Sequence, residues 1–249
     1  MNLARAALAL LILTAPIPAT AMLGGGPAPA KLAAQTALIV STRGASCSGA
    51  VLSNDLLLTA AHCVEPSSDY AVVIFEQGGP RVVPVTKIEL HPRFDPSHFK
   101  TRKPTPDLAL VKIAMPLPSH YEPAFIERIP LQPRAGEYFT LAGYGVTREG
   151  DGKTAGRLHT VILPAIGNTI DETGIIMVRL SERDGKVAGA CTGDSGGPVF
   201  RGGDVAAVIG WSTGYEGRGC GSVTGATLVA QQFDWISATA RKLGSALAQ

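Results

Sequence analysis

Residues 191–198 of the sequence read Cys-Thr-Gly-Asp-Ser-Gly-Gly-Pro, a setting that suits a serine nucleophile. The glycines on both sides of Ser195 allow a tightly bent, sterically open backbone, so a reacting carbonyl can approach the hydroxyl. Glycine-rich turns that contain Asp and Ser are also common in loops without chemistry. The other residues that acyl transfer requires must therefore decide the interpretation.

Acyl transfer by a serine requires a base that takes the hydroxyl proton and an acid that orients the base. All histidines precede Ser195, at positions 62, 91, 98, 120 and 159. This order excludes an α/β-hydrolase, whose G-x-S-x-G elbow is followed by its histidine. His62 is the strongest candidate base because it ends an apolar run beside Cys63. The other four histidines are expected to be ordinary solvated side chains.

The candidate acid is Asp107, which stands directly before the alternating apolar segment 108–113. An aspartate in this position is either a simple turn residue or a buried carboxylate held at the start of a strand. The second reading gives His62 and Ser195 the partner that their chemistry needs.

Composition narrows the protein class. With 249 residues, 45% hydrophobic, the chain can form one large domain or two packed halves. The formal charge of +2 and the 17% of charged residues give no reason to expect nucleic acid or an anionic membrane surface as a partner.

The first 21 residues are typical of a secretory signal peptide. Arg5 supplies a positive start, 6–13 form a short apolar run, and Ala19-Thr20-Ala21 is a small-x-small cleavage site. The run is too short for a membrane span, so we expect no membrane association of the mature form, which is secreted or periplasmic. Export favours disulfides over metal ligation, although three pairings are open for the four cysteines, Cys47, Cys63, Cys191 and Cys220.

The elements that must position these side chains are short β-type runs separated by turn residues. We predict strands over 37–42, 50–53, 56–59, 70–75, 81–90, 108–113, 138–142, 156–163, 174–180, 197–200, 205–211 and 226–230. A proline-rich stretch over 116–133 suits a crossing between two halves. A helical period is convincing only over 233–247. The pattern favours β-barrels or a sandwich.

Three segments together resemble the trypsin/chymotrypsin family of serine proteases, in particular its secreted bacterial members. They are Thr-Ala-Ala-His-Cys at 59–63, Asp-Leu-Ala-Leu at 107–110 and Gly-Asp-Ser-Gly-Gly-Pro at 193–198. Lesser similarities are His-Pro-Arg-Phe at 91–94, Gly-Tyr-Gly at 143–145 and the tryptophans at 211 and 235. The resemblance spans essentially the whole mature chain.

The resemblance implies an all-β fold of two six-stranded antiparallel barrels with a C-terminal α-helix. The protease domain is then 22–249, with the first barrel at about 22–115, the crossing at about 116–133 and the second barrel and helix at about 134–249. It implies His62 as general base and acid, Asp107 as its orienting partner and Ser195 as nucleophile. The backbone N–H groups of Gly193 and Ser195 would form the oxyanion hole.

The resemblance also implies disulfides between Cys47 and Cys63 and between Cys191 and Cys220. In this family a new α-amino group pairs with the Asp before the nucleophile, and Met-Leu-Gly-Gly at 22–25 resembles such a start. We therefore expect the Met22 amine to pair with Asp194 after signal cleavage. No Arg or Lys activation site directly precedes Met22, so no separate zymogen is expected; the alternative is a floppy glycine linker.

Position by position, the resemblance places Gly189 and Ala190 at the base of the primary specificity pocket. No carboxylate is present there, so we expect cleavage after small or medium apolar residues rather than after Arg or Lys. The other expected pocket residues are Gly210, Trp211, Ser212 and Gly225. Gly210 replaces a serine that usually donates to the triad aspartate. The loop 211–220 is longer than usual and carries Glu216 and Arg218.

The expected function is a serine endopeptidase that acts on peptide or protein substrates, with a protein inhibitor as a further candidate partner. We expect a monomer, no cofactor and no metal; Glu76 has no second carboxylate nearby in its loop for calcium. Two alternatives remain open. One is a non-catalytic binding protein on a protease scaffold, and the other is an esterase that uses the same three residues.

Overall fold

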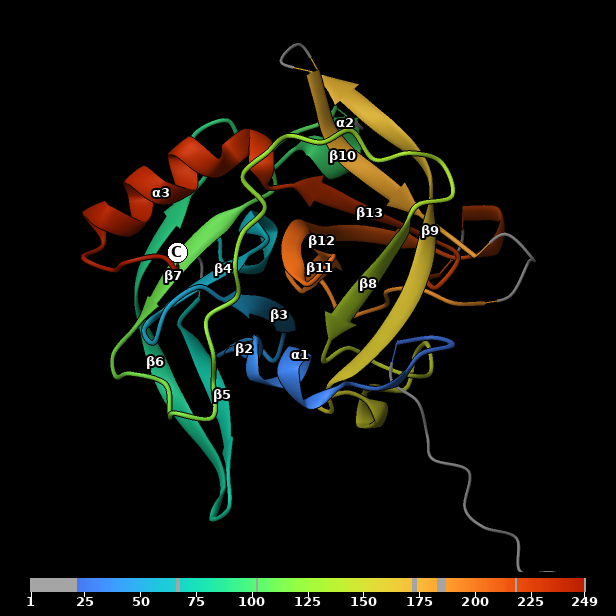
Figure 1. Cartoon of the computed structure of the whole chain (residues 1–249). Coiled ribbons are helices and arrows are strands. Elements are labelled where there is room, and N and C mark those ends of the chain that lie inside the picture. The colour runs from blue at the N-terminus through green and yellow to red at the C-terminus, as the bar shows by residue number, and fades with distance from the viewer. Residues whose placement is uncertain are drawn as a thin grey trace, which may run out of the picture.

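The computed structural model describes residues 22–65, 68–101, 103–171, 174–182, 187–217 and 219–248. Within them the chain forms two antiparallel β-barrels that lie side by side, followed by a helix (Figure 1). The expected signal segment 1–21 lies outside the described residues. In the described part, no helix combines the length and apolar character that a membrane crossing requires.

The first barrel closes in the order β2-β3-β4-β7-β6-β5. Its strands are β2 (Thr36–Ser41), β3 (Ser46–Val51), β4 (Leu56–Thr59), β5 (Tyr70–Glu76), β6 (Gly79–Leu90) and β7 (Ala109–Ile113). The short helix α1 (Ala30–Ala34) precedes the barrel, and α2 (His98–Thr101) lies between β6 and β7. All four residues of β4 are buried, which explains the continuous apolar run of its sequence.

The second barrel contains β8 (Tyr138–Gly143), β9 (His159–Asp171), β10 (Gly174–Leu180), β11 (Pro198–Arg201), β12 (Asp204–Thr213) and β13 (Val223–Leu228). Their order is β9-β10-β13-β12-β11-β8, and pairing of β8 with β9 closes the barrel. The two-residue strand β1 (Gly26–Pro27) adds to the outer edge of β9. The expected fold class, two six-stranded antiparallel barrels with a C-terminal helix, is confirmed.

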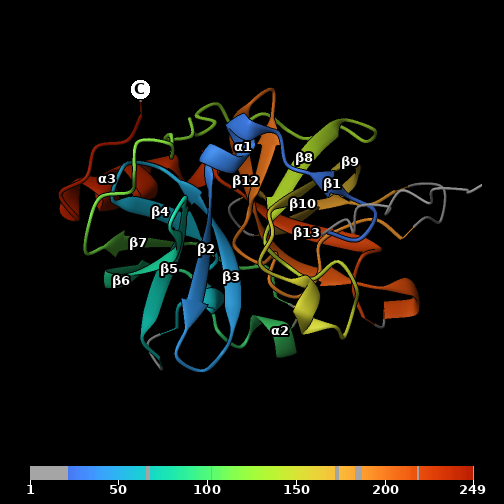
Figure 2. The same ribbon diagram turned by 90° about the horizontal axis from the view of Figure 1, so that it is seen from below.

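The C-terminal helix α3 (Phe233–Lys242) follows the second barrel but packs on the first, beside β7 (Figures 1 and 2). Its buried residues Ile236 and Ala240 belong to the same apolar cluster as β4 and β7. The helix ends five residues before the predicted limit because Gly244 adopts a left-handed conformation (φ 73°), a common helix terminator. The C-terminal segment thus packs against the first barrel.

All twelve predicted strands are present, and the bounds of β3 and β9 differ most from the prediction. Strand β3 starts at Ser46 rather than at residue 50, because its Ser, Cys and Gly residues carry little β-propensity of their own. Strand β9 continues to Asp171, beyond the predicted end at 163. Its register with β10 shifts between Arg179 and Leu180, and this irregularity accommodates the stretch from Pro164 to Gly167.

Candidate active site

Ser195 lies in the loop between β10 and β11, and close packing of this loop against the first barrel explains its glycines. Gly193 and Gly196 have φ angles of 94° and 79°, a region that side chains with a Cβ rarely adopt. A Cβ at Gly196 would also overlap with the Thr59 hydroxyl of β4. The glycine-rich sequence therefore lets the loop of the second barrel touch the first.

His62 and Asp107 both come from the first barrel. His62 lies in the 3₁₀ turn η1 (Ala61–Cys63) directly after β4, and Asp107 stands two residues before β7. Because β4 pairs with β7, with Thr59 opposite Ala109, the ends of these strands bring the two side chains together.

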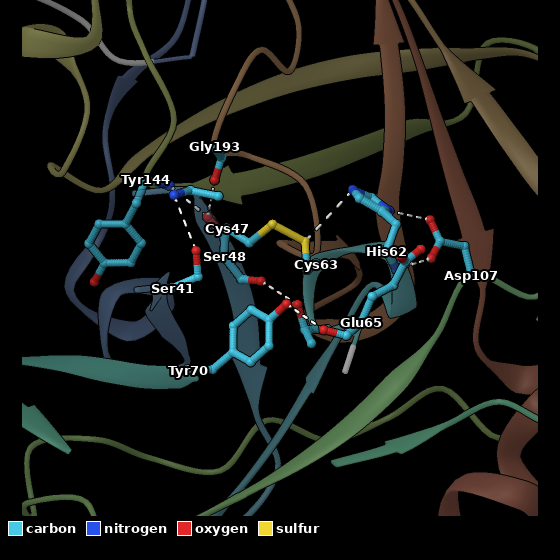
Figure 3. The surroundings of a disulfide bond; sticks show 12 residues. Ser41, Cys47, Ser48, His62, Cys63, Glu65, Tyr70, Asp107, Tyr144 and Gly193 are labelled. Carbon is cyan, nitrogen blue, oxygen red and sulfur yellow. Dashed lines mark hydrogen bonds and ion pairs between the residues drawn. A yellow bond between two sulfur atoms is a disulfide. The ribbon is translucent and has the colours of Figure 1, made fainter. Parts of the chain in front are cut away.

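The Asp107 carboxylate contacts both the imidazole and the backbone of His62 (Figure 3). Its Nδ1 lies 2.6 Å from Oδ2, and its backbone N–H donates to Oδ1 over 3.0 Å. Asp107 is 2% exposed, so the carboxylate is shielded from water. This geometry favours the tautomer with the proton on Nδ1, which leaves Nε2 as the basic nitrogen.

His62 and Ser195 line one cavity of about 330 Å³ between the barrels. The Ser195 hydroxyl makes no hydrogen bond to any other described residue. The hydrogen bond between a catalytic nucleophile and its base often forms or shortens only when substrate is bound. The three residues that the sequence motifs single out thus meet at one place, although they lie far apart in the chain.

Ser48, a residue that sequence reasoning missed, fixes the backbone around the nucleophile. Its hydroxyl donates to the Gly193 carbonyl over 3.0 Å and accepts from the Tyr144 N–H over 2.9 Å, as Figure 3 shows. Its backbone N–H donates to the Ser195 carbonyl over 2.8 Å. In the part of the chain that is described, the N–H groups of Gly193 and Ser195 have no acceptor, so both remain available to a ligand oxygen.

Both disulfides have the pairing that the resemblance implies, Cys47 with Cys63 and Cys191 with Cys220. The first lies beside the candidate base, with the Cys63 sulfur 3.8 Å from His62 Nε2 (Figure 3). Cys47, His62 and Cys63 are also close enough to suggest a metal site. Their sulfurs are bonded to each other, however, and a disulfide does not provide the thiolates that such a site needs.

Asp194 is fully buried and receives two backbone hydrogen bonds. They come from Gly145 over 2.8 Å and from Cys191 over 2.9 Å. Burial raises the pKa of Asp194 to about 7, because a charged carboxylate is costly away from water. Asp194 therefore occupies a site that a buried cation would stabilise.

Met22 is fully buried in the apolar cluster of the second barrel. The next residue continues this docking, since the Leu23 carbonyl accepts from the Gly189 N–H over 2.9 Å. The segment after residue 21 is thus packed against the loop that leads to Asp194, and it is not a free linker.

The expected pocket base differs from the sequence-based picture. Gly189 is not among the described residues that line the cavity. The Thr224 hydroxyl lies beside it, 3.1 Å from where a Gly189 Cβ would be. The same hydroxyl accepts from the Ala190 N–H over 3.0 Å. Gly225 leaves no free space either, because the Trp211 ring packs directly on it. Thr224, which the motifs did not reveal, is buried directly beside Gly189.

The remaining expected pocket residues do line the cavity: Ala190, Gly210, Trp211 and Ser212. The Trp211 Nε1–H donates to the Met177 sulfur over 3.1 Å, which fixes the indole. A Cβ at Gly210 would lie 3.6 Å from Asp107 Oδ2, so this glycine is next to the candidate acid as expected. Of the long loop after Trp211, Gly219 and Cys220 reach the cavity. Arg218 lies outside the described residues.

Two of the other histidines differ from expectation. His91 and His159 are each 5% exposed rather than solvated. His91 packs edge-on against Trp235, with ring centroids 4.6 Å apart, and its Nδ1 accepts from the Arg93 N–H. Both side chains are therefore packed inside the protein. Their local sequence does not indicate this burial.

Comparisons with known proteins agree with this geometry. A family model described as Trypsin matches residues 23–236. Trypsin eta of Drosophila melanogaster is 32% identical over 213 residues, covering 77% of this chain and 76% of the relative. Trypsin epsilon of Drosophila erecta is 26% identical over 211 residues, covering 79% and 78%.

The fold is also similar to that of a solved structure. Neuropsin, a serine protease expressed in the limbic system of mouse brain, superposes with a TM-score of 0.71 over 88% of this chain and 99% of its own. The sequences are 20% identical, so this match speaks for the fold alone.

Proposed function

The chain belongs to the trypsin family of serine proteases and is a serine-type endopeptidase, and we propose that His62, Asp107 and Ser195 carry its reaction. The observation that supports this assignment most directly is the position of the His62 imidazole, whose Nδ1 lies 2.6 Å from Asp107 and which lines the same cavity as Ser195. The substrate class that follows from the family is a peptide or protein, and protein inhibitors are further candidate partners.

The proposed reaction proceeds through an acyl-enzyme. Ser195 Oγ attacks the peptide carbonyl carbon while His62 Nε2 takes the hydroxyl proton. Asp107 holds the ring and stabilises its charged form. The carbonyl oxygen becomes an oxyanion that accepts from the free N–H groups of Gly193 and Ser195. His62 then gives its proton to the leaving amine, which leaves an acyl group on Ser195. Water next attacks this acyl carbon while His62 takes its proton, and His62 returns the proton to Ser195 as the carboxylic acid leaves.

For the residue before the cleaved bond we propose a small or medium apolar side chain. The expected base at Gly189 carries no carboxylate, and Thr224 fills the space beside it. Burying the ammonium or guanidinium of Lys or Arg there would leave a charge without a partner. A short apolar side chain avoids this cost and can still pack against the Trp211 ring, which lines the cavity.

For maturation we propose that signal cleavage after Ala21 produces the active form of a secreted or periplasmic enzyme. The new Met22 amine would pair with Asp194, whose carboxylate is buried with two N–H donors. Pairing raises the amine pKa above its free value of about 7.7–8.0, so the pair persists at neutral pH and is lost as the pH rises through the folded value. N-terminal sequencing of active secreted protein tests this, and a start well downstream of Met22 contradicts it.

The catalytic assignment is tested by treating purified mature protein with an organophosphonate and locating the adduct by mass spectrometry. We expect one adduct on Ser195 and none in Ser195→Ala. Absence of a label with intact folding would favour a binding protein on this scaffold. A labelled protein that hydrolyses esters but no member of a peptide library would favour an esterase.

A further inference from the structure

Glu149, in the segment between β8 and the 3₁₀ turn η2 (Gly152–Thr154), reaches the cavity from the side of the second barrel. Its carboxylate lies directly against the backbone of Gly219, and a Cβ at Gly219 would overlap with both carboxylate oxygens. Gly219 precedes Cys220, whose disulfide to Cys191 forms part of the cavity wall. The absence of a side chain at Gly219 thus makes room for an acid at the cavity.

Among the described residues that line this cavity, Glu149 is the sole carboxylate and His62 the sole other titratable side chain. No cation in the described part of the chain pairs with Glu149: its neighbour Arg148 contacts Asp151 instead, over 3.6 Å. A negative charge therefore faces the substrate channel without an internal partner among those residues.

The position of Glu149 also limits what it can recognise. Glu149 is exposed, whereas Ala190 and Cys191, which line the inner part of the same cavity, are buried. The carboxylate accordingly lies on the solvent side of the cavity, at its mouth. A group that pairs with Glu149 belongs to a substrate residue next to the one that enters the pocket.

We propose that Glu149 forms a cation-binding subsite at the mouth of the cavity, which selects substrates with Lys or Arg adjacent to the small residue at the cleaved bond. This proposal rests on the proposed protease function. An opposite charge within about 4 Å at a partly exposed site stabilises a complex modestly, and such pairs weaken with salt. We expect a preference of about three- to tenfold for basic over neutral side chains at this position.

The test is a peptide library with alanine fixed before the cleaved bond and all residues varied at the flanking positions. The wild type should enrich Lys and Arg at one flanking position. Glu149→Gln, which keeps the shape, should abolish this enrichment, and Glu149→Lys should reverse it toward Asp and Glu. Salt of 0.5 M should reduce the wild-type preference. Glu216→Gln is the matched control, because Glu216 does not line the cavity, and its profile should equal the wild type.

Three results would overturn the proposal while leaving the protease function intact. The first is an identical profile for wild type and Glu149→Gln. The second is a basic enrichment confined to the residue inside the pocket. The third is a basic preference that is absent from the wild type and appears only in Arg218→Ala. This result would mean that Arg218, and not a substrate residue, pairs with Glu149 in the wild type. Failure of the protease function is distinguishable, because organophosphonate would leave Ser195 unlabelled in every variant, including the wild type.

Discussion

Thr224 and Ala190 are joined by a hydrogen bond in which the backbone N–H of Ala190 donates to the Thr224 hydroxyl over 3.0 Å. The bond holds the threonine hydroxyl beside Gly189, 3.1 Å from where a Gly189 Cβ would be. The Thr224 side chain thereby connects strand β13 to the loop before the nucleophile, and we expect it to limit the depth of the specificity pocket.

Thr224→Gly is expected to open this space and to broaden specificity. We expect kcat/KM for peptides with Leu or Phe before the cleaved bond to rise about tenfold relative to Ala, because pocket volume controls such selectivity. Thr224→Ser retains the hydroxyl acceptor and should remain close to the wild type. Rates are normalised to the fraction of protein that organophosphonate labels. An unchanged Leu-to-Ala ratio in Thr224→Gly would show that Thr224 does not set the depth.

Asp107→Asn is expected to lower kcat about 10⁴-fold with little change in folding. The amide is of equal size but presents an N–H or a neutral oxygen to His62 Nδ1, so the ring is no longer held in the reactive tautomer. Active-site titration together with thermal unfolding separates the two effects. A loss of less than tenfold in kcat, in a folded variant, would remove Asp107 from the catalytic assignment.

Gly210→Ser and Gly225→Ala are expected to have opposite outcomes. A Cβ at Gly210 makes only ordinary contacts, at 3.6 Å or more, and a serine there adds a donor near Asp107. We expect unaltered stability and a two- to fivefold rise in kcat/KM, which corresponds to about 0.5–1 kcal/mol. A Cβ at Gly225 overlaps with the Trp211 ring, so Gly225→Ala should cost about 1–3 kcal/mol of unfolding free energy. Denaturant titration of both variants measures the contrast, and equal stabilities would contradict it.

His91 is expected to make stability depend on pH. Burial, assisted by the Arg93 charge, lowers the pKa of His91 to about 4, whereas an unfolded histidine titrates near 6.5. The unfolded chain therefore binds the proton first, and stability falls as the pH decreases from about 6.5 to about 4. The loss reaches at most about 3 kcal/mol.

The check is to measure unfolding free energy against pH for the wild type and His91→Asn, in which the Asn oxygen can still accept from the Arg93 N–H. The variant should lose less stability than the wild type between pH 7 and pH 4.5. Parallel curves for the two proteins would exclude His91 as the source.

The strand pattern was predictable because alternating and continuous apolar runs depend mainly on local sequence. The bounds of β3 and β9 were not, since pairing with neighbouring strands extends them through Gly, Ser and Pro. The motif residues His62 and Ser195 do line one cavity, and Asp107 contacts His62 from behind it. Their roles stay predictions until variants are measured.

The pocket was harder to predict because it depends on strand register. Trp211 pairs with Gly225 and Ser212 with Thr224 across β12 and β13. A shift of one residue sends a side chain to the other face of a strand, so the register decides that Thr224 lies beside Gly189 while Gly225 lies under the Trp211 ring. Glu149 was equally hidden, because a distant loop brings it to Gly219 and no local motif records that contact.

Ser48 joins the two barrels through the backbone of the loop that carries Ser195. Exchange of the first barrel between two relatives would have to retain a small hydroxyl at this position, or the recipient's own loop would lose its support. Each half is a closed barrel, yet the loop that carries the nucleophile in the second depends on a side chain of the first.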